Sequence, residues 1–130
     1  MSRNIIKINR GDSFEFSFRI PDKTNPDKNY ILTDEDAVFF ALVQPHQRFE
    51  DAIFIKGYDH TDLCKISENG VPTGEILVEL LPSDTRYLAP GIYYYTVKLQ
   101  RGGTLESATA CDDAKEIRTI IERTKFIINE

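Results

Sequence analysis

The stretch LPSDTRYLAPGIYYYTVKL, from Leu81 to Leu99, places three consecutive tyrosines directly after the dipeptide Gly-Ile. Residues two apart in a strand share a face, so Tyr93 and Tyr95 would lie on one side and Tyr94 on the other. The stretch therefore predicts a strand from Ile92 to Gln100 with two tyrosines in the core, and not a stacking platform of three exposed rings. We also expect the Tyr93 hydroxyl to return to the backbone near the preceding turn.

The residues that precede this strand carry a helix-capping pattern. Ser83 or Asp84 can begin a helix, and Pro90 disfavours helical backbone in the residue before it. The distance between these signals allows a single helical turn, which we predict near Ser83 to Tyr87.

Other strands are indicated by alternation of apolar and polar residues. DSFEFSFRI places Phe14, Phe16 and Phe18 on one side, whereas AVFFALVQ, from Ala37 to Gln44, is apolar on both faces, as in a strand that is covered on both sides. The remaining candidates are NIIKINR, DAIFIKGYD ending at Gly57, and GEILVELL.

Turn residues, among them the RGGT that follows Gln100, separate these runs, and no long helix lies between them. We therefore predict an all-β fold, an antiparallel immunoglobulin-like β-sandwich with at most one short helical turn, as a single domain over residues 1–130. The side chains expected to be mostly buried are Phe16, Phe18, Phe40, Val78, Tyr93, Tyr95 and Phe126.

The C-terminal segment DDAKEIRTIIERTKFIINE supports two interpretations. Ala114, Ile117, Ile120 and Ile121 recur at helical spacing after a possible aspartate cap. The same segment is rich in isoleucine, threonine and phenylalanine, which favour strands. Periodicity alone does not separate one helix from two strands here.

Composition argues against several classes of function. The 16 basic and 21 acidic residues give a net charge of -5, and the basic residues are dispersed, so nucleic acid is not an expected partner. No apolar run approaches the roughly 18 residues of a membrane span. Cys64 and Cys111 form no Cys-x-x-Cys motif and are expected to be free thiols. We found no catalytic, phosphate-binding or metal-binding motif, and we expect neither enzymatic activity nor a cofactor or metal.

The order of these motifs resembles that of small β-sandwich domains in tail and baseplate structural proteins of tailed bacteriophages and prophages, as at the N-terminus of baseplate upper proteins. The matching segments cover most of the chain: INRGDSFEFSFRI, AVFFALVQ, LPSDTRYLAPGIYYYTVKL and EIRTIIERTKFII. The resemblance implies that the C-terminal segment forms a strand, EIRTII, then a turn and a last strand, KFII. It also implies a structural component of the virion tail, present in the bacterial cytoplasm during assembly.

Our first functional hypothesis is a protein–protein assembly module that packs against copies of itself or against other tail proteins. The candidate interface residues are those expected on outer faces: Tyr94, Ile92, Phe39 and Leu77. The first strand, NIIKI, and the last, KFIINE, are expected to be poorly protected sheet edges, which favour association.

The alternative hypothesis is a carbohydrate-binding module for host cell-surface glycans. Its candidate stacking rings are Tyr30, Tyr58, Tyr87 and Tyr94. Because these tyrosines are scattered along the chain, the sequence favours the assembly module. Tyr58 and Tyr87 side by side in a groove would favour the glycan-binding alternative.

Overall fold

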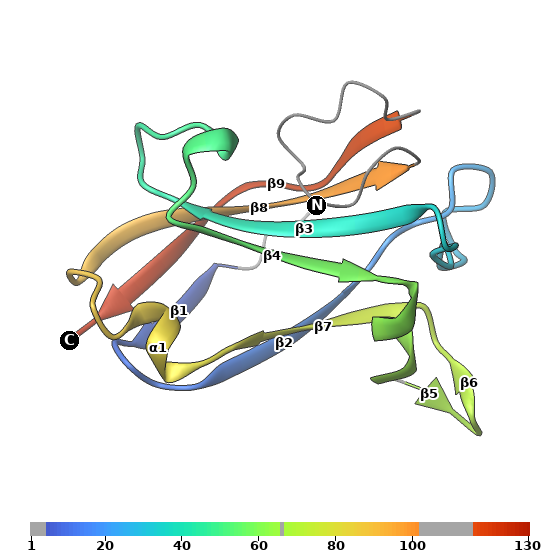
Figure 1. Cartoon of the computed structure of the whole chain (residues 1–130), viewed down its shortest axis with the longest axis horizontal. Coiled ribbons are helices and arrows are strands. Elements are labelled where there is room, and N and C mark those ends of the chain that lie inside the picture. Colours follow the sequence, from blue (N-terminus) through green and yellow to red (C-terminus); the bar gives the residue numbers. More distant parts are fainter. Residues whose placement is uncertain (1–4, 66, 102–115) are drawn as a thin grey trace.

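The computed structural model describes residues 5–65, 67–101 and 116–130, which form mainly strands (Figure 1). The elements are β1 (Ile6–Asn9), β2 (Phe14–Arg19), β3 (Asp36–Val43), η1 (Phe49–Asp51), β4 (Phe54–Asp59), η2 (His60–Lys65), β5 (Ser67–Glu68), β6 (Val71–Pro72), β7 (Glu75–Leu80), α1 (Pro82–Thr85), β8 (Gly91–Arg101) and β9 (Glu116–Asn129). The predicted all-β fold with one short α-helical turn is confirmed, and η1 and η2 add two 3-10 segments. Residues 102–104 of the expected RGGT turn lie outside the described residues, as do Cys111 and the side chain of Cys64.

Two β layers face each other. The larger layer is a five-stranded sheet in the order β1-β9-β8-β3-β4, and the smaller is the antiparallel pair β2-β7 (Figure 1). The Phe16 ring joins the layers, because its centroid lies 5.8 Å from that of Phe40 and 6.0 Å from that of Tyr95.

The expectation of a purely antiparallel sheet is wrong at one pair, since β1 runs parallel to β9. After β1 the chain passes into β2 of the other layer. Within the large sheet, β1 therefore pairs with the C-terminal strand, β9. The immunoglobulin-like topology stays a prediction.

The core lies between the layers and confirms the predicted buried residues. Phe40, Val78 and Phe126 have no exposed surface, and Tyr95 and Tyr93 are 1% and 6% exposed. Phe16 and Phe18 keep a minority of their surface exposed and pack against this core, so they too are mostly buried. Among the described strands β2 pairs with β7 alone, and a two-stranded layer is too narrow to cover a five-stranded sheet completely.

The corner before β8 forms as predicted. The Tyr93 hydroxyl donates to the carbonyl of Ala89 at 2.6 Å and so ties the strand to the turn. The helical turn α1 begins one residue earlier than expected, at Pro82, because the Asp84 carboxylate accepts the backbone N–H of Leu81 at 2.7 Å.

The described part of the C-terminal segment forms one continuous strand, β9, so the turn implied by the family resemblance is wrong. Tyr95 lies opposite Thr124, and Lys98 lies opposite Thr119. An advance of three residues along β8 therefore corresponds to an advance of five residues along β9. The extra residues are accommodated by β-bulges, which interrupt the ladder without reversing the chain. The helical interpretation is excluded for the described residues 116–129.

Candidate interaction surface

The outward face of the large sheet carries an alternating set of isoleucines and lysines across β1, β9 and β8. Lys7 pairs with Ile127, which also pairs with Ile92, and in the neighbouring row Lys125 pairs with Tyr94. Ile5 precedes β1 on the same face as Lys7. We call this surface the β1–β9–β8 patch, and its residues are Ile5, Lys7, Ile92, Tyr94, Lys125 and Ile127.

The patch is exposed mainly through its aliphatic and basic members. Ile5 is 54% and Ile92 50% exposed, and Lys7 and Lys125 are also exposed. The patch brings together two of the predicted interface residues, Ile92 and Tyr94. The other four members were missed because their place on this face depends on two long-range pairings, β8 with β9 and β9 with β1, which local sequence does not reveal.

Tyr94 is half-buried because an arginine from the bulged part of β9 lies over it. The Arg123 guanidinium is 5.0 Å from the Tyr94 ring centroid. The same guanidinium donates to the carbonyls of Gln44, Pro45 and Gln47 at 2.9, 2.6 and 3.0 Å. Arg123 therefore fastens the β3–β4 connection to the outward face of the sheet.

Phe39 was predicted as a candidate interface residue on an outer face, and in the folded chain it is only 5% exposed. It does lie on the outward face, as alternation requires, but Phe49 of η1 packs against it. Its ring also lies over Gly57, where an added Cβ would be 3.3 Å from the ring. The β3–β4 connection thus covers a surface that would otherwise be apolar and open.

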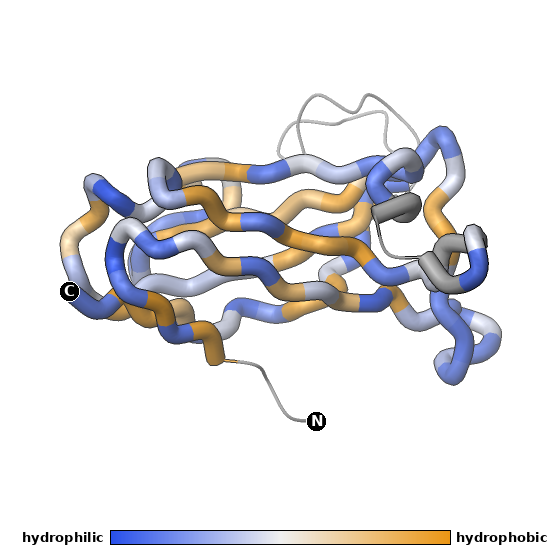
Figure 2. Tube along the Cα trace, turned by 90° about the horizontal axis from the view of Figure 1, so that it is seen from below, coloured by the Kyte–Doolittle hydropathy of each residue, from blue (hydrophilic) through white to orange (hydrophobic). Residues whose placement is uncertain are grey.

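Leu77 lies in the other layer, on the outward face of β7, and is half-buried. It pairs with Ser17 of β2, between the pairs Glu15–Glu79 and Arg19–Glu75. The alternation of hydrophilic and hydrophobic residues along the strands is visible in Figure 2. Leu77 therefore does not belong to the same surface as Ile92 and Tyr94.

The predicted sheet edges are only partly confirmed. β1 is an edge strand, and no described strand pairs with its far side. β9 lies between β1 and β8, so the prediction of an edge at KFIINE is wrong.

The candidate stacking tyrosines differ in exposure and surroundings. Tyr87 is 85% exposed, whereas Tyr58 is half-buried, packs against the core and has a hydrogen bond with the Glu79 backbone. The ring contacts among the described residues do not pair these two. Tyr30 is half-buried, and its hydroxyl donates to the buried carboxylate of Asp36.

Burial changes the chemistry of two of these phenols. Loss of contact with water raises the pKa of Tyr58 to about 12 and is the largest effect there. Burial also raises the pKa of Tyr30 to about 12, and the Asp36 carboxylate adds to that rise. Both groups therefore act as neutral hydrogen-bonding side chains near neutral pH.

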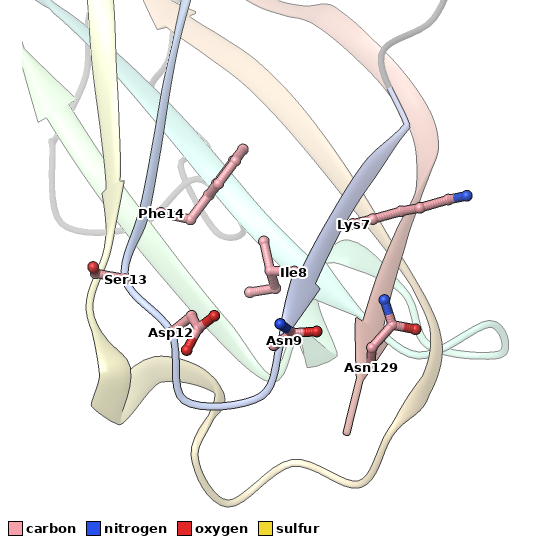
Figure 3. Close-up of a pocket in the computed structure, with 7 residues that line it drawn as sticks. All are labelled: Lys7, Ile8, Asn9, Asp12, Ser13, Phe14 and Asn129. Carbon is pink, nitrogen blue, oxygen red and sulfur yellow. The ribbon is translucent and has the colours of Figure 1, made fainter.

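Small pockets occur at both ends of the two-layered fold. One of about 220 Å³ lies where β1 turns into β2 (Figure 3). Ile8 and Phe14 point into the fold there, while Lys7 points away toward the outward face. A second pocket of about 220 Å³ is lined by Tyr30, Arg101 and Arg118 together with Asp22, Lys23, Thr24 and Leu99.

Neither a metal site nor a membrane helix is found in the described parts of the chain. Their side chains include no group of three or more histidines, cysteines or carboxylates placed to hold a metal ion. None of their helices has the length and apolar character that crossing a membrane requires.

Comparison with known proteins adds no relative. No protein-family model, curated protein or solved structure matches the chain significantly.

Proposed function

We propose that this protein is a non-catalytic structural protein that works by packing against other protein subunits. In keeping with the sequence resemblance, we place it in the tail or baseplate of a tailed bacteriophage or prophage, with bacterial cytoplasm as the site of assembly. Its partners would be copies of itself, other tail proteins, or both.

The observation that carries the proposal is the exposure of neighbouring isoleucines in the β1–β9–β8 patch. Ile5 and Ile92 each expose about half of their surface, and Ile127 lies between β1 and β8 in the same face. Adjoining exposed aliphatic side chains at a sheet face are typical of protein interaction sites. β1 is also an edge strand, and no described strand pairs with the backbone groups on its far side. Lys7 and the short length of β1 reduce the tendency of this edge to pair with another strand.

The proposal predicts association that buries at least about 1,000 Å² in total, the usual minimum for a specific interface. Light scattering over a concentration series tests self-association, and a pull-down against the products of neighbouring genes tests association with other proteins. A protein that stays monomeric and captures none of those products would contradict the proposal.

A matched pair of variants assigns the association to the patch. Ile92→Asp places a charge among the isoleucines and should weaken association, whereas Ile55→Asp, at a 37% exposed position on β4, should not. Equal effects of the two variants would contradict the assignment. Glycan binding by a monomeric protein, weakened by Tyr87→Ala, would instead support the carbohydrate-binding alternative.

A further inference from the structure

The two layers are joined along one side of the fold and have open strand edges along the other. On the side of β4 and β7, the Lys56 ammonium lies 2.8 Å from the Asp84 carboxylate, which connects β4 to the helical turn after β7. On the other side the layers end in β1 and β2. Within the described chain β1 pairs with β9 alone and β2 with β7 alone, so each of these two strands has an open edge.

An open pocket of about 220 Å³ lies between β1 and β2 (Figure 3). Ile8 of β1 and Phe14 of β2 point into it, and Phe14 is half-buried. The lining also includes the acid Asp12, on the turn that follows β1. An extended segment laid along β1 would therefore bring its inward side chains against apolar side chains of both layers.

The backbone of β1 presents hydrogen-bonding groups at its open edge. The N–H of Arg10 donates to the carbonyl of Asn129 in β9 at 2.7 Å. Successive residues of a strand direct their backbone groups to opposite neighbours, so Ile8 also faces β9. The N–H and C=O groups of Ile5 and Lys7 then face the open side, where an extended segment can pair with them, as in recognition by strand addition.

The side chains beside this edge favour one sign of charge in an added strand. Lys7 and Lys125 are exposed on the outward face, in the neighbouring strands β1 and β9. No ion pair joins either lysine to another residue in the described ranges. Opposite charges in neighbouring strands stabilise a sheet and like charges destabilise it. The outward side chains of an added strand should therefore be acidic.

A second copy of β1 suits this edge poorly. The antiparallel register that pairs all of residues 5–9 with the same residues of a second copy sets Lys7 directly opposite Lys7 of that copy. Like charges in such a cross-strand pair are unfavourable. The charge at the edge thus favours a different chain as its occupant.

We infer that the open edge of β1 binds an extended segment of another protein, whose apolar residues face the pocket and whose acidic residues face outward beside Lys7. The inference rests on the proposed assembly function and names the chemistry of the partner and its mode of contact. The segment would form a sixth strand of the large sheet, next to β1 (Figure 1). Backbone hydrogen bonds would give affinity, and the alternating side chains would give specificity.

A short peptide tests the edge directly. The probe is a capped peptide of about eight residues that alternates valine with glutamate, a usual strand length. Its binding, followed by NMR titration, should slow amide hydrogen exchange at Lys7, whose N–H faces the open side. Exchange at Ile8 should change much less, because that N–H already faces β9.

Two further peptides of the same length separate charge from alternation. A peptide that alternates valine with lysine should bind at least about threefold more weakly, because its outward lysines would lie beside Lys7. An all-glutamate peptide should also bind more weakly, since it has no apolar side chains for the pocket.

A matched pair of variants places the binding at Lys7. Lys7→Glu should weaken binding of the valine–glutamate peptide at least about threefold and strengthen binding of the valine–lysine peptide. Lys28→Glu makes the same charge change at an exposed position between β2 and β3 and should bind the first peptide like the wild type. Circular dichroism and thermal unfolding establish that both variants are folded. Raising the salt concentration from about 0.05 to 0.5 M should weaken the wild-type binding, because exposed charge pairs are screened.

The outcomes separate this inference from the proposed function. Strand addition is overturned if the valine–glutamate peptide does not bind, if the valine–lysine peptide binds equally well, or if binding leaves exchange at Lys7 unchanged. Self-association that slows this exchange without any peptide would assign the edge to a second copy and overturn the inference as well. Association detected by light scattering or by the pull-down, beside a negative peptide result, would leave the assembly function standing.

Discussion

A single hydroxyl ties the turn before β8 to the strand that follows. Tyr93 is 6% exposed and donates to the Ala89 carbonyl at 2.6 Å. We expect Tyr93→Phe to lower the free energy of unfolding by about 0.5–1.5 kcal/mol, the usual net contribution of one hydrogen bond. Urea unfolding measures this, with Tyr87→Phe at an 85% exposed position as the control. Equal stability of the two variants would show that the corner bond contributes nothing.

Two glycines with similar backbone geometry differ in the space around them. Gly74 and Gly70 have φ of +88° and +78°, which L side chains rarely adopt. A Cβ on Gly74 would lie 2.7 Å from the Cβ of Asn29, whereas nothing lies within 4 Å of one on Gly70. Gly70→Ala should therefore cost about 1 kcal/mol of stability and Gly74→Ala clearly more. A thermal unfolding comparison that ranks Gly70→Ala as the more damaging would contradict this.

The alternation of residues along a strand predicts faces well but says little about what covers a face. Tyr93 and Tyr95 were placed in the core correctly because their positions follow from the strand alone. Phe39 was assigned to the correct face, yet its burial depends on Phe49, ten residues away in η1. No local signal indicates that the β3–β4 connection returns over the sheet.

At the scale of elements, Arg123 holds the β3–β4 connection through three carbonyls. Arg123→Lys keeps the charge but loses the planar set of donors that reaches several acceptors at once. We expect faster amide hydrogen exchange at Asp51 and Ala52, whose N–H groups bond within this connection. Arg86→Lys, at an exposed position outside this connection, is the control. Unchanged exchange in Arg123→Lys would show that the connection does not depend on this arginine.

The errors about β9 have the same non-local origin. Its bulges depend on the register with β8, and its central place in the sheet depends on the parallel strand β1, more than a hundred residues earlier. The sequence predicts the strands KFII and NIIKI separately, but not their pairing. For this reason it selected Ile92 and Tyr94 as candidate interface residues but not the other four residues on the same outward face, Ile5, Lys7, Lys125 and Ile127.

At the scale of the whole molecule, the unequal width of the layers explains the half-buried phenylalanines of β2. Each strand was predictable, since its alternation is local, whereas the division into five and two strands is a property of the complete chain. That division also places the β1–β9–β8 patch and Leu77 on the outward faces of different layers. Which outward side chains share a surface is therefore visible only when the two layers are assembled.

Alkaline pH should destabilise the whole fold through Tyr30 and Tyr58. Both have a pKa of about 12 in the folded chain, against 10.0 as the ordinary value. The folded state therefore holds these protons more tightly than the unfolded state does, so stability is intact below pH 10 and falls as the pH rises from about 10 to 12. Urea unfolding at pH 8 and pH 11 should show that Tyr58→Phe loses less stability with pH than the wild type, while Tyr87→Phe behaves like the wild type. An identical pH dependence in Tyr58→Phe would mean that the Tyr58 phenol titrates alike in both states, contrary to its burial against the core.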